Sequence, residues 1–117
     1  MSNQPVVPVA IVTGGSRGIG KACVLALVSA GFQVVFTYHS NQLAADAVVA
    51  AAKALGGNAK AVKADAGSKV ASQALIDETV AEFGRLDVLV NNAGITKDTL
   101  LIRMSDDDWE QVLQTIS

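Results

Sequence analysis

A glycine-rich segment near the N-terminus is the part of this sequence whose residue types and spacing could do chemistry. The segment Thr13–Gly20 (TGGSRGIG) follows directly on the apolar run Val9–Val12. A chain that leaves a buried strand and enters a helix within a few residues needs backbone angles that a Cβ penalises. The unpaired amides and the positive dipole end of such a helix attract an anion. The junction therefore predicts a phosphate or pyrophosphate site.

The glycines of this segment are expected to have different tasks. Gly14 and Gly18 supply the turn angles, and Gly20 lets the helix pack closely on the strand. The spacing is G-x-x-x-G-x-G rather than the common dinucleotide fingerprint G-x-G-x-x-G, and a lone glycine-rich loop is weak evidence unless a strand and a helix flank it. Both flank it here. The alternative is a tight strand-to-helix turn that binds nothing.

The residues after the second apolar run bear on the choice of a dinucleotide. Proteins that select NAD place Asp or Glu at the end of the second strand, about 20 residues past the glycines, to hold the ribose 2′-hydroxyl. This chain has Thr37-Tyr38-His39-Ser40 there, and its first acidic residue is Asp46. A 2′-phosphate would meet no repulsion and could gain hydrogen bonds from His39 and Ser40 and the charge of Arg17. NADP(H) is therefore favoured, although His39 could equally be an idle surface imidazole.

Composition narrows the class of protein. Half of the 117 residues are hydrophobic, 17% are charged and the net charge is −2, which is typical of a folded globular chain. The lack of a basic run argues against nucleic acid or an anionic membrane surface as a partner. No apolar run is long enough to cross a bilayer and no leader precedes the fold, so a cytoplasmic location is expected.

Cys23 is the only cysteine, which excludes an internal disulfide or a cysteine metal cluster, and no metal site is expected. Its place on the apolar stripe of the first helix indicates core packing.

Predicted strands and helices alternate, which is the pattern of a parallel sheet with helices on both faces. We expect one domain, residues 1–117, of the α/β class: a Rossmann-type doubly wound sheet with strand order 3-2-1-4, incomplete beyond the fourth strand. The expected strands are 9–13, 34–38, 59–63 and 86–90. The expected helices begin at about Ile19, at about Asn41, after a cap at Ser68, and at Ser105.

The end of the sequence carries two further expectations. The fourth strand should be an exposed edge, because strands 5 and 6 of a full doubly wound fold would lie beside it. The helix from Ser105 should place four apolar side chains on one face: Trp109, Val112, Leu113 and Ile116. Trp109 is then expected in a core or an interface rather than at a cofactor.

Three motifs together resemble the short-chain dehydrogenase/reductase family: Thr13–Gly20, then Asp65, then Asn91–Gly94 (NNAG). Within that family the closer similarity is to the 3-oxoacyl-(acyl-carrier-protein) reductases of fatty acid biosynthesis, through Thr13–Gly20 and the stretch Asn91–Met104. The resemblance covers almost all of the chain, but it corresponds only to the N-terminal half of family members.

The resemblance implies cofactor contacts at ten positions. It places the cofactor phosphates and the adjoining ribose on the glycine segment, the adenine on the end of the third strand and the nicotinamide on the end of the fourth: Gly14, Ser16, Arg17, Gly18 and Ile19; Asp65 and Ala66; Asn92, Ala93 and Gly94. Asp65 could instead cap a helix, and Asn91 and Asn92 could instead be turn formers with local backbone hydrogen bonds.

The implied activity is NADPH-dependent reduction of a 3-oxoacyl thioester, carried by acyl carrier protein or CoA, to the 3-hydroxyacyl thioester. A homo-oligomer, commonly a tetramer, is implied for the complete enzyme. In the family a Tyr donates the proton, assisted by a Lys four residues on, by a Ser and by an Asn of the fourth helix. The only tyrosine here is Tyr38, its fourth neighbour is Gln42, and Ile116 stands where the helical Asn is expected.

No catalytic residue is therefore assigned to this chain. We expect a cofactor-binding half that lacks the catalytic half, through truncation or a change of reading frame, and that is inactive alone. Two alternatives stay open: a fragment of an acetoacetyl-CoA reductase or another short-chain reductase, and a non-catalytic product that binds nucleotide or pairs with full-length subunits.

Overall fold

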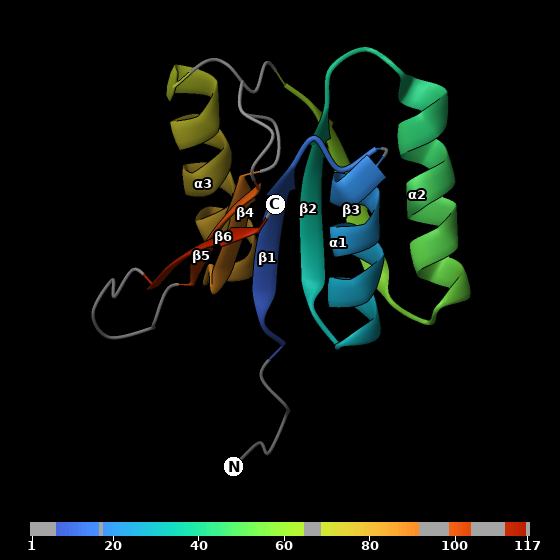
Figure 1. Ribbon diagram of the computed structural model, residues 1–117, viewed down its shortest axis with the longest axis horizontal. Helices are drawn as coiled ribbons and strands as arrows, with labels where there is room; N and C mark the ends of the chain where they lie inside the picture. The colour runs from blue at the N-terminus through green and yellow to red at the C-terminus, as the bar shows by residue number, and fades with distance from the viewer. Residues whose placement is uncertain (1–6, 17, 65–68, 92–98, 104–111, 117) are drawn as a thin grey trace.

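A single six-stranded sheet organises the molecule (Figure 1). The computed structural model describes residues 7–16, 18–64, 69–91, 99–103 and 112–116. Four strands are mutually parallel in the order β3-β2-β1-β4, which confirms the predicted 3-2-1-4 arrangement. Their bounds lie within two residues of the predicted ones: β1 (Val9–Thr13), β2 (Gln33–Tyr38), β3 (Asn58–Lys63) and β4 (Val88–Asn91).

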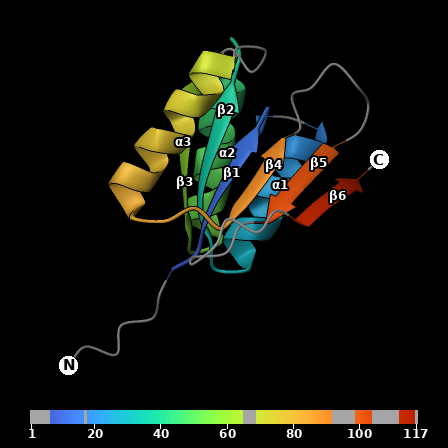
Figure 2. The same ribbon diagram turned by 90° about the vertical axis from the view of Figure 1, so that its left-hand side faces the viewer.

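Helices cover both faces of the parallel strands (Figure 2). The helices α1 (Gly18–Ser29) and α2 (Gln42–Ala54) lie on one face, and α3 (Lys69–Phe83) lies on the other. Successive strand residues point to opposite faces, so each strand contributes to two cores. In β2, for example, Phe36 packs with α1 and α2, whereas Val35 packs with Leu75 of α3. The doubly wound layering predicted from the sequence is confirmed.

Local sequence signals set the helix ends. The Asn41 side chain accepts a hydrogen bond from the Ala44 amide at 3.0 Å and caps α2. Gly31, Gly56 and Gly84 follow the three helices with φ of 96°, 83° and 81°, in the left-handed region that ends a helix at low cost in glycine. The predicted cap Ser68 lies outside the described residues.

Two strands extend the sheet beyond β4 and correct two expectations. β5 (Thr99–Arg103) pairs antiparallel with β4, so β4 is not an edge of the sheet. β6 (Val112–Ile116) pairs antiparallel with β5, so the predicted helix is wrong for these residues. Val112, Thr115 and Ile116 are β-branched and favour a strand once a neighbouring strand offers backbone partners. The remainder of the predicted helix, including Trp109, lies outside the described residues.

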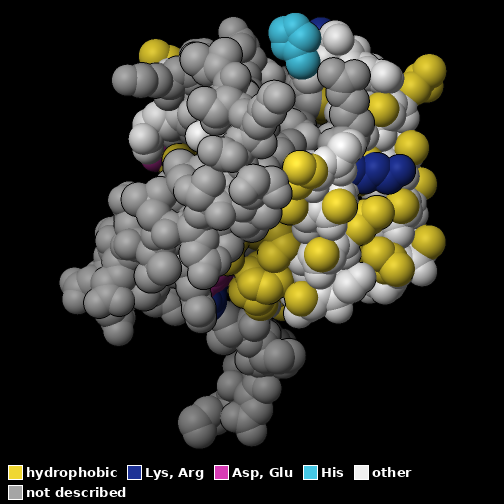
Figure 3. All heavy atoms as spheres, viewed as in Figure 1, with side chains coloured by type: hydrophobic (Ala, Val, Ile, Leu, Met, Phe, Trp, Pro, Cys, Tyr) yellow, Lys and Arg dark blue, Asp and Glu magenta, His cyan; other side chains and the backbone are white. Residues whose placement is uncertain are grey.

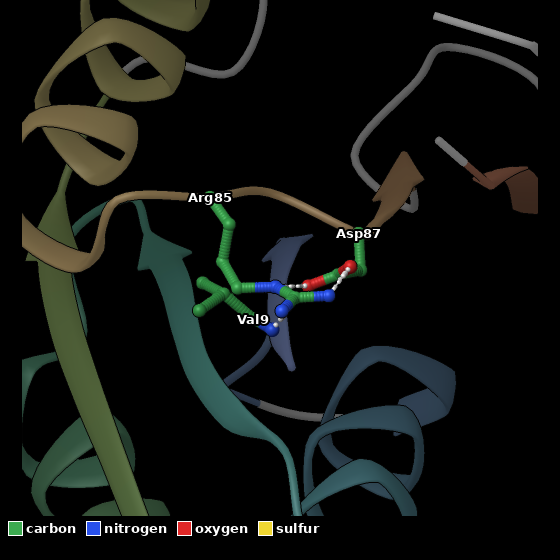
Figure 4. Close-up of polar contacts among 3 residues, drawn as sticks. All are labelled: Val9, Arg85 and Asp87. Carbon is green, nitrogen blue, oxygen red and sulfur yellow. Dashed lines mark hydrogen bonds and ion pairs between the residues drawn. The ribbon is translucent and has the colours of Figure 1, made fainter. Parts of the chain in front are cut away.

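A polar clip joins β1 to the segment before β4 at the amino ends of the strands (Figure 4). The Asp87 carboxylate accepts from the Val9 amide at 2.8 Å, and the Asp87 amide donates to the Val9 carbonyl at 2.8 Å. Arg85 holds the same carboxylate from two nitrogens, at 2.8 and 2.5 Å. The clip therefore sets the register between the two central strands.

The outer face of α1 and α2 is largely apolar (Figure 3). Its exposed positions include Ala22 and Ala26 of α1 and Leu43 of α2. None of the helices in the described part of the chain is long and apolar enough to cross a membrane. The same described residues contain no group of three or more His, Cys, Asp or Glu side chains that could hold a metal ion.

Candidate nucleotide-binding site

The carboxyl ends of the parallel strands meet at one edge of the sheet. Thr13 of β1 is in register with Asn91 of β4, and Tyr38 of β2 with Lys63 of β3. The Ala64 amide then donates to the Tyr38 carbonyl at 3.1 Å, which keeps the chain leaving β3 beside the end of β2. Ligands of doubly wound sheets bind outside this edge. The glycine segment therefore lies where the fold class places a ligand.

The glycine segment adopts the turn that its sequence predicts. Gly14 and Gly18 have φ of 67° and 62°, values that L side chains rarely adopt, so the prediction for these two glycines is confirmed. Gly20 is buried in the first turn of α1. A Cβ on Gly18 would meet no atom within 4 Å, so the space beside this glycine is open.

Gly15 is the glycine of closest approach, and the sequence reasoning missed it. A Cβ at this position would lie 2.6 Å from the Phe36 Cβ and 2.9 Å from a Val24 methyl carbon. The loop is therefore pressed against β2 and α1 at the same point. In the sequence, this position is visible only as a second glycine directly after Gly14. The packing of Phe36 and Val24 against it explains why the residue must be glycine.

Hydrogen bonds from β2 fix the start of the loop. The Gly14 amide donates to the Thr37 hydroxyl oxygen at 3.0 Å, and the Gly15 amide donates to the Thr37 carbonyl at 2.9 Å. Thr37 is a second residue that the sequence reasoning did not single out. A threonine at the end of a β-branched strand reads as an ordinary strand residue, and only the folded chain brings it to the loop.

Asn91 is held by a long-range contact. The Thr13 hydroxyl oxygen lies 3.1 Å from the Asn91 side-chain oxygen and 3.5 Å from the Val90 carbonyl, and its single proton can go to either acceptor. Asn91 is the last residue of β4. The contact ties the first residue of the glycine segment to the residue that precedes Asn92-Ala93-Gly94.

The charges and donors at this edge fit a phosphate. Gly18 and Ile19 are exposed and open α1, and the first N–H groups of a helix have no partner within it. The first turn of α1 carries no acidic residue, and the first acidic residue of the sequence is Asp46. His39 and Ser40, which directly follow β2, are also exposed. Ser16 of the glycine segment is half-buried.

Several predicted site residues cannot be compared with the fold. Arg17, Asp65, Ala66, Asn92, Ala93 and Gly94 lie outside the described residues. Tyr38 is described, and it packs half-buried against the core that β2 shares with α1 and α2. Cys23 packs against that same core, as predicted, and burial raises the pKa of its thiol.

A small cavity of about 60 Å³ lies on the α3 side of the same edge. Its walls come from β1, β4 and the N-terminal half of α3, and they are mostly apolar: Ile11, Thr13, Ser72, Leu75, Ile76, Leu89 and Asn91. Thr13 and Asn91, which are among these lining residues, are the last residues of β1 and β4. The cavity therefore adjoins the ends of the two central strands.

Sheet order, helix layering and the glycine turn between β1 and α1 define the Rossmann-type class of α/β proteins. The family model described as short chain dehydrogenase matches residues 8–116. The chain belongs to the short-chain dehydrogenase/reductase family.

Among curated relatives, a 3-oxoacyl-(acyl-carrier-protein) reductase of Synechocystis sp. is 54% identical over 105 residues, which are 90% of this chain and 42% of that protein. The 3-oxoacyl-(acyl-carrier-protein) reductase FabG of Staphylococcus aureus is 45% identical over 106 residues, which are 91% of this chain and 43% of that protein. The chain thus spans less than half the length of these relatives.

Solved structures show the same fold. A short-chain dehydrogenase/reductase mutant of Serratia marcescens matches with a TM-score of 0.72 and 46% identity, over 80% of this chain and 38% of that one. A short chain dehydrogenase of Burkholderia cenocepacia in complex with NADP matches with a TM-score of 0.68 and 49% identity, over 74% of this chain and 35% of that one.

Proposed function

We propose that these 117 residues form the NADP(H)-binding part of a short-chain reductase that converts a 3-oxoacyl thioester into a 3-hydroxyacyl thioester. The observation that carries the proposal is the glycine turn at the carboxyl edge of the sheet. It opens α1 with the exposed residues Gly18 and Ile19, and no acidic residue follows β2 before Asp46. The cofactor phosphates would gain helix-terminal donors there and meet no acidic residue in the glycine segment or the first turn of α1.

The preference for NADP(H) rests on the residues after β2. His39 and Ser40 are exposed and can donate hydrogen bonds to a 2′-phosphate, and Arg17 can add its charge. An NAD-selecting site would instead need a carboxylate for the 2′-hydroxyl. The Burkholderia relative, which is bound to NADP, supports the same choice.

The other contacts of the cofactor are proposed from the family resemblance. Gly14, Ser16, Gly18 and Ile19 would lie along the phosphates and the adjoining ribose. Asp65 and Ala66 would hold the adenine, and the nicotinamide would lie against three residues that follow β4: Asn92, Ala93 and Gly94. When bound, the cofactor supplies the hydride, and this chain's residues bind and orient it.

The substrate class rests on the curated relatives, which are 3-oxoacyl-(acyl-carrier-protein) reductases. The thioester carrier would be acyl carrier protein or CoA. We further propose that the chain takes part in a cytoplasmic homo-oligomer, a tetramer by analogy with the family. Because Tyr38 packs into the core beside α1 and α2, we assign no proton donor to these residues and propose that they supply binding and not acid catalysis.

A cofactor titration tests the proposal. NADPH fluorescence should change on binding to the chain, and NADPH should bind at least about tenfold more tightly than NADH, since a charge-assisted contact contributes about 1.4 kcal/mol or more. Ser40→Asp should reverse the preference by placing a carboxylate after β2, and Ser40→Ala is the matched control. Tighter binding of NADH by the unaltered chain contradicts the proposal.

An activity assay tests the assignment of roles. With NADPH and an acetoacetyl thioester, the 117-residue chain should show no oxidation of NADPH above the rate without protein. Turnover by this chain would contradict the view that it lacks a proton donor. Binding of NADPH without turnover is the expected combination.

A further inference from the structure

We infer that Thr37 is a positioning residue of the glycine loop. It binds the amides of Gly14 and Gly15 at the strand end of the loop, called here the closed part, and leaves the helix end, called here the open part, to receive the anion. Thr37 is 2% exposed and is the fifth of the six residues of β2. Its neighbour Phe36 is paired with Val12 of β1, and Thr37 is the first β2 residue beyond that pairing. It therefore lies where β1 ends and the glycine loop begins.

Thr37 accepts two successive amides of the loop. Its hydroxyl oxygen accepts a hydrogen bond from the Gly14 amide at 3.0 Å, and its carbonyl oxygen accepts one from the Gly15 amide at 2.9 Å. The side chain and the backbone of one residue thus hold two neighbouring peptide groups. The short distance that a Cβ on Gly15 would leave to Phe36 shows that the loop lies directly on β2 at this point.

This pairing determines which amides can meet a phosphate. An amide N–H carries one proton, and the protons of Gly14 and Gly15 point to Thr37. The amides that open α1, at Gly18 and Ile19, belong to the turn whose N–H groups lack helical partners, and both residues are exposed. The anion should therefore bind at the helix end of the loop and not at its strand end.

Of the two acceptors on Thr37, only the side-chain hydroxyl can be removed by substitution. Thr37→Val keeps the shape and the backbone carbonyl but replaces the hydroxyl, to which the part-buried Gly14 amide donates, with a methyl group that cannot accept a hydrogen bond. Thr37→Ser keeps the acceptor. Thr79→Val is a matched control, because Thr79 is also buried, at 3% exposure, but lies on α3.

Amide hydrogen exchange by NMR tests the closed part without any cofactor. Thr37→Val should accelerate exchange of the Gly14 amide at least about tenfold, as expected when its acceptor is removed. Thr37→Ser should restore slow exchange, and Thr79→Val should leave it unchanged. Unchanged exchange at Gly14 in folded Thr37→Val overturns the inference. If Thr37→Val does not fold, rapid exchange at Gly14 in Thr37→Ser or in the unaltered chain overturns it equally.

Anion titration tests the open part. Inorganic pyrophosphate and NADPH should shift the amide resonances of Gly18 and Ile19 and leave the exchange of Gly14 and Gly15 slow. Thr37→Val should weaken NADPH binding about tenfold, with rescue by Thr37→Ser. Strong perturbation of the Gly14 amide by pyrophosphate would overturn the division of the loop. This arm rests on the proposed function: if neither anion binds the unaltered chain, that function fails, and the exchange data still decide the role of Thr37.

Discussion

Two glycines of the loop are required for different physical reasons. Gly18 has a φ of 62° and open space around it, so only its backbone angle restricts the residue type. Gly15 has no positive φ, but a Cβ there would overlap Phe36 and Val24. Substitutions at the two positions should therefore follow opposite trends with side-chain type.

The first prediction separates these causes. Gly18→Ala should cost about 1–2 kcal/mol of unfolding free energy, and Gly18→Asn less, since Asn tolerates the left-handed region. Gly15→Ala should cost about 1–3 kcal/mol because the core must shift, and Gly15→Asn should cost more than Gly15→Ala. Urea unfolding followed by circular dichroism measures both pairs. The same ranking of Ala and Asn at both positions would contradict the explanation.

The thiol of Cys23 gives a pH-dependent prediction. Burial disfavours the thiolate and raises the pKa of Cys23, so at a given pH less of the reactive form is present than in a free thiol. Alkylation by iodoacetamide at pH 8 should be slower than that of glutathione, and the rate should keep rising as the pH passes the ordinary thiol range. The rate in urea-unfolded chain is the control. A folded-state rate equal to the unfolded one would contradict the core assignment.

At the scale of elements, α2 links the stability of the fold to the proposed cofactor site. Its N-cap Asn41 directly follows Ser40, and the Asn41 side chain accepts from the Ala44 amide. The residue that begins α2 is therefore next in sequence to a residue proposed to bind the 2′-phosphate. Capping and cofactor choice can be separated at this one position.

Two substitutions at Asn41 test the link between α2 and the proposed cofactor site. Asn41→Ala should lower the unfolding free energy by about 1 kcal/mol through loss of the cap. Asn41→Asp should retain the cap but bring a carboxylate near the proposed phosphate, and so weaken NADPH binding while sparing NADH. Thermal unfolding and fluorescence titration give the two readouts. An equal loss of NADPH and NADH affinity in Asn41→Asp would oppose the proposed position of the 2′-phosphate.

For the molecule as a whole, two ion pairs lie in different environments. Arg85 and Asp87 have side chains that are 24% and 16% exposed, and Asp87 also holds the Val9 amide 78 residues away. Lys60 of β3 and Glu82 of α3 are 2.6 Å apart but are 50% and 46% exposed. Solvent screening makes the second pair a weak contributor despite its short distance.

Double-mutant cycles should give a larger coupling energy for the Arg85–Asp87 pair than for the Lys60–Glu82 pair. Asp87→Ala should cost about 1–3 kcal/mol of unfolding free energy, because it removes the carboxylate to which the Val9 amide and the Arg85 guanidinium donate. The coupling of Arg85→Ala with Asp87→Ala should exceed that of Lys60→Ala with Glu82→Ala, for which about 0.5 kcal/mol or less is expected. Equal couplings would contradict the dependence on burial.

The parallel part of the fold was predictable from the sequence. Apolar runs, helix-length patterns and turn glycines act locally, so β1 to β4, the three helices and the positive φ of Gly14 and Gly18 were all predictable from it. The family motifs added candidate cofactor residues, of which those from Gly14 to Ile19 stand at the predicted strand-to-helix junction, except Arg17, which lies outside the described residues.

The rest of the fold depends on contacts between distant parts of the chain. The strand state of Val112–Ile116 depends on hydrogen-bond partners in β5, which a helical pattern of apolar residues cannot reveal. The roles of Gly15 and Thr37 likewise arise because β2 meets the loop across more than 20 positions of the chain. Contacts at such a separation are set by packing and topology, whereas the turn itself is set by the backbone preferences of its own glycines.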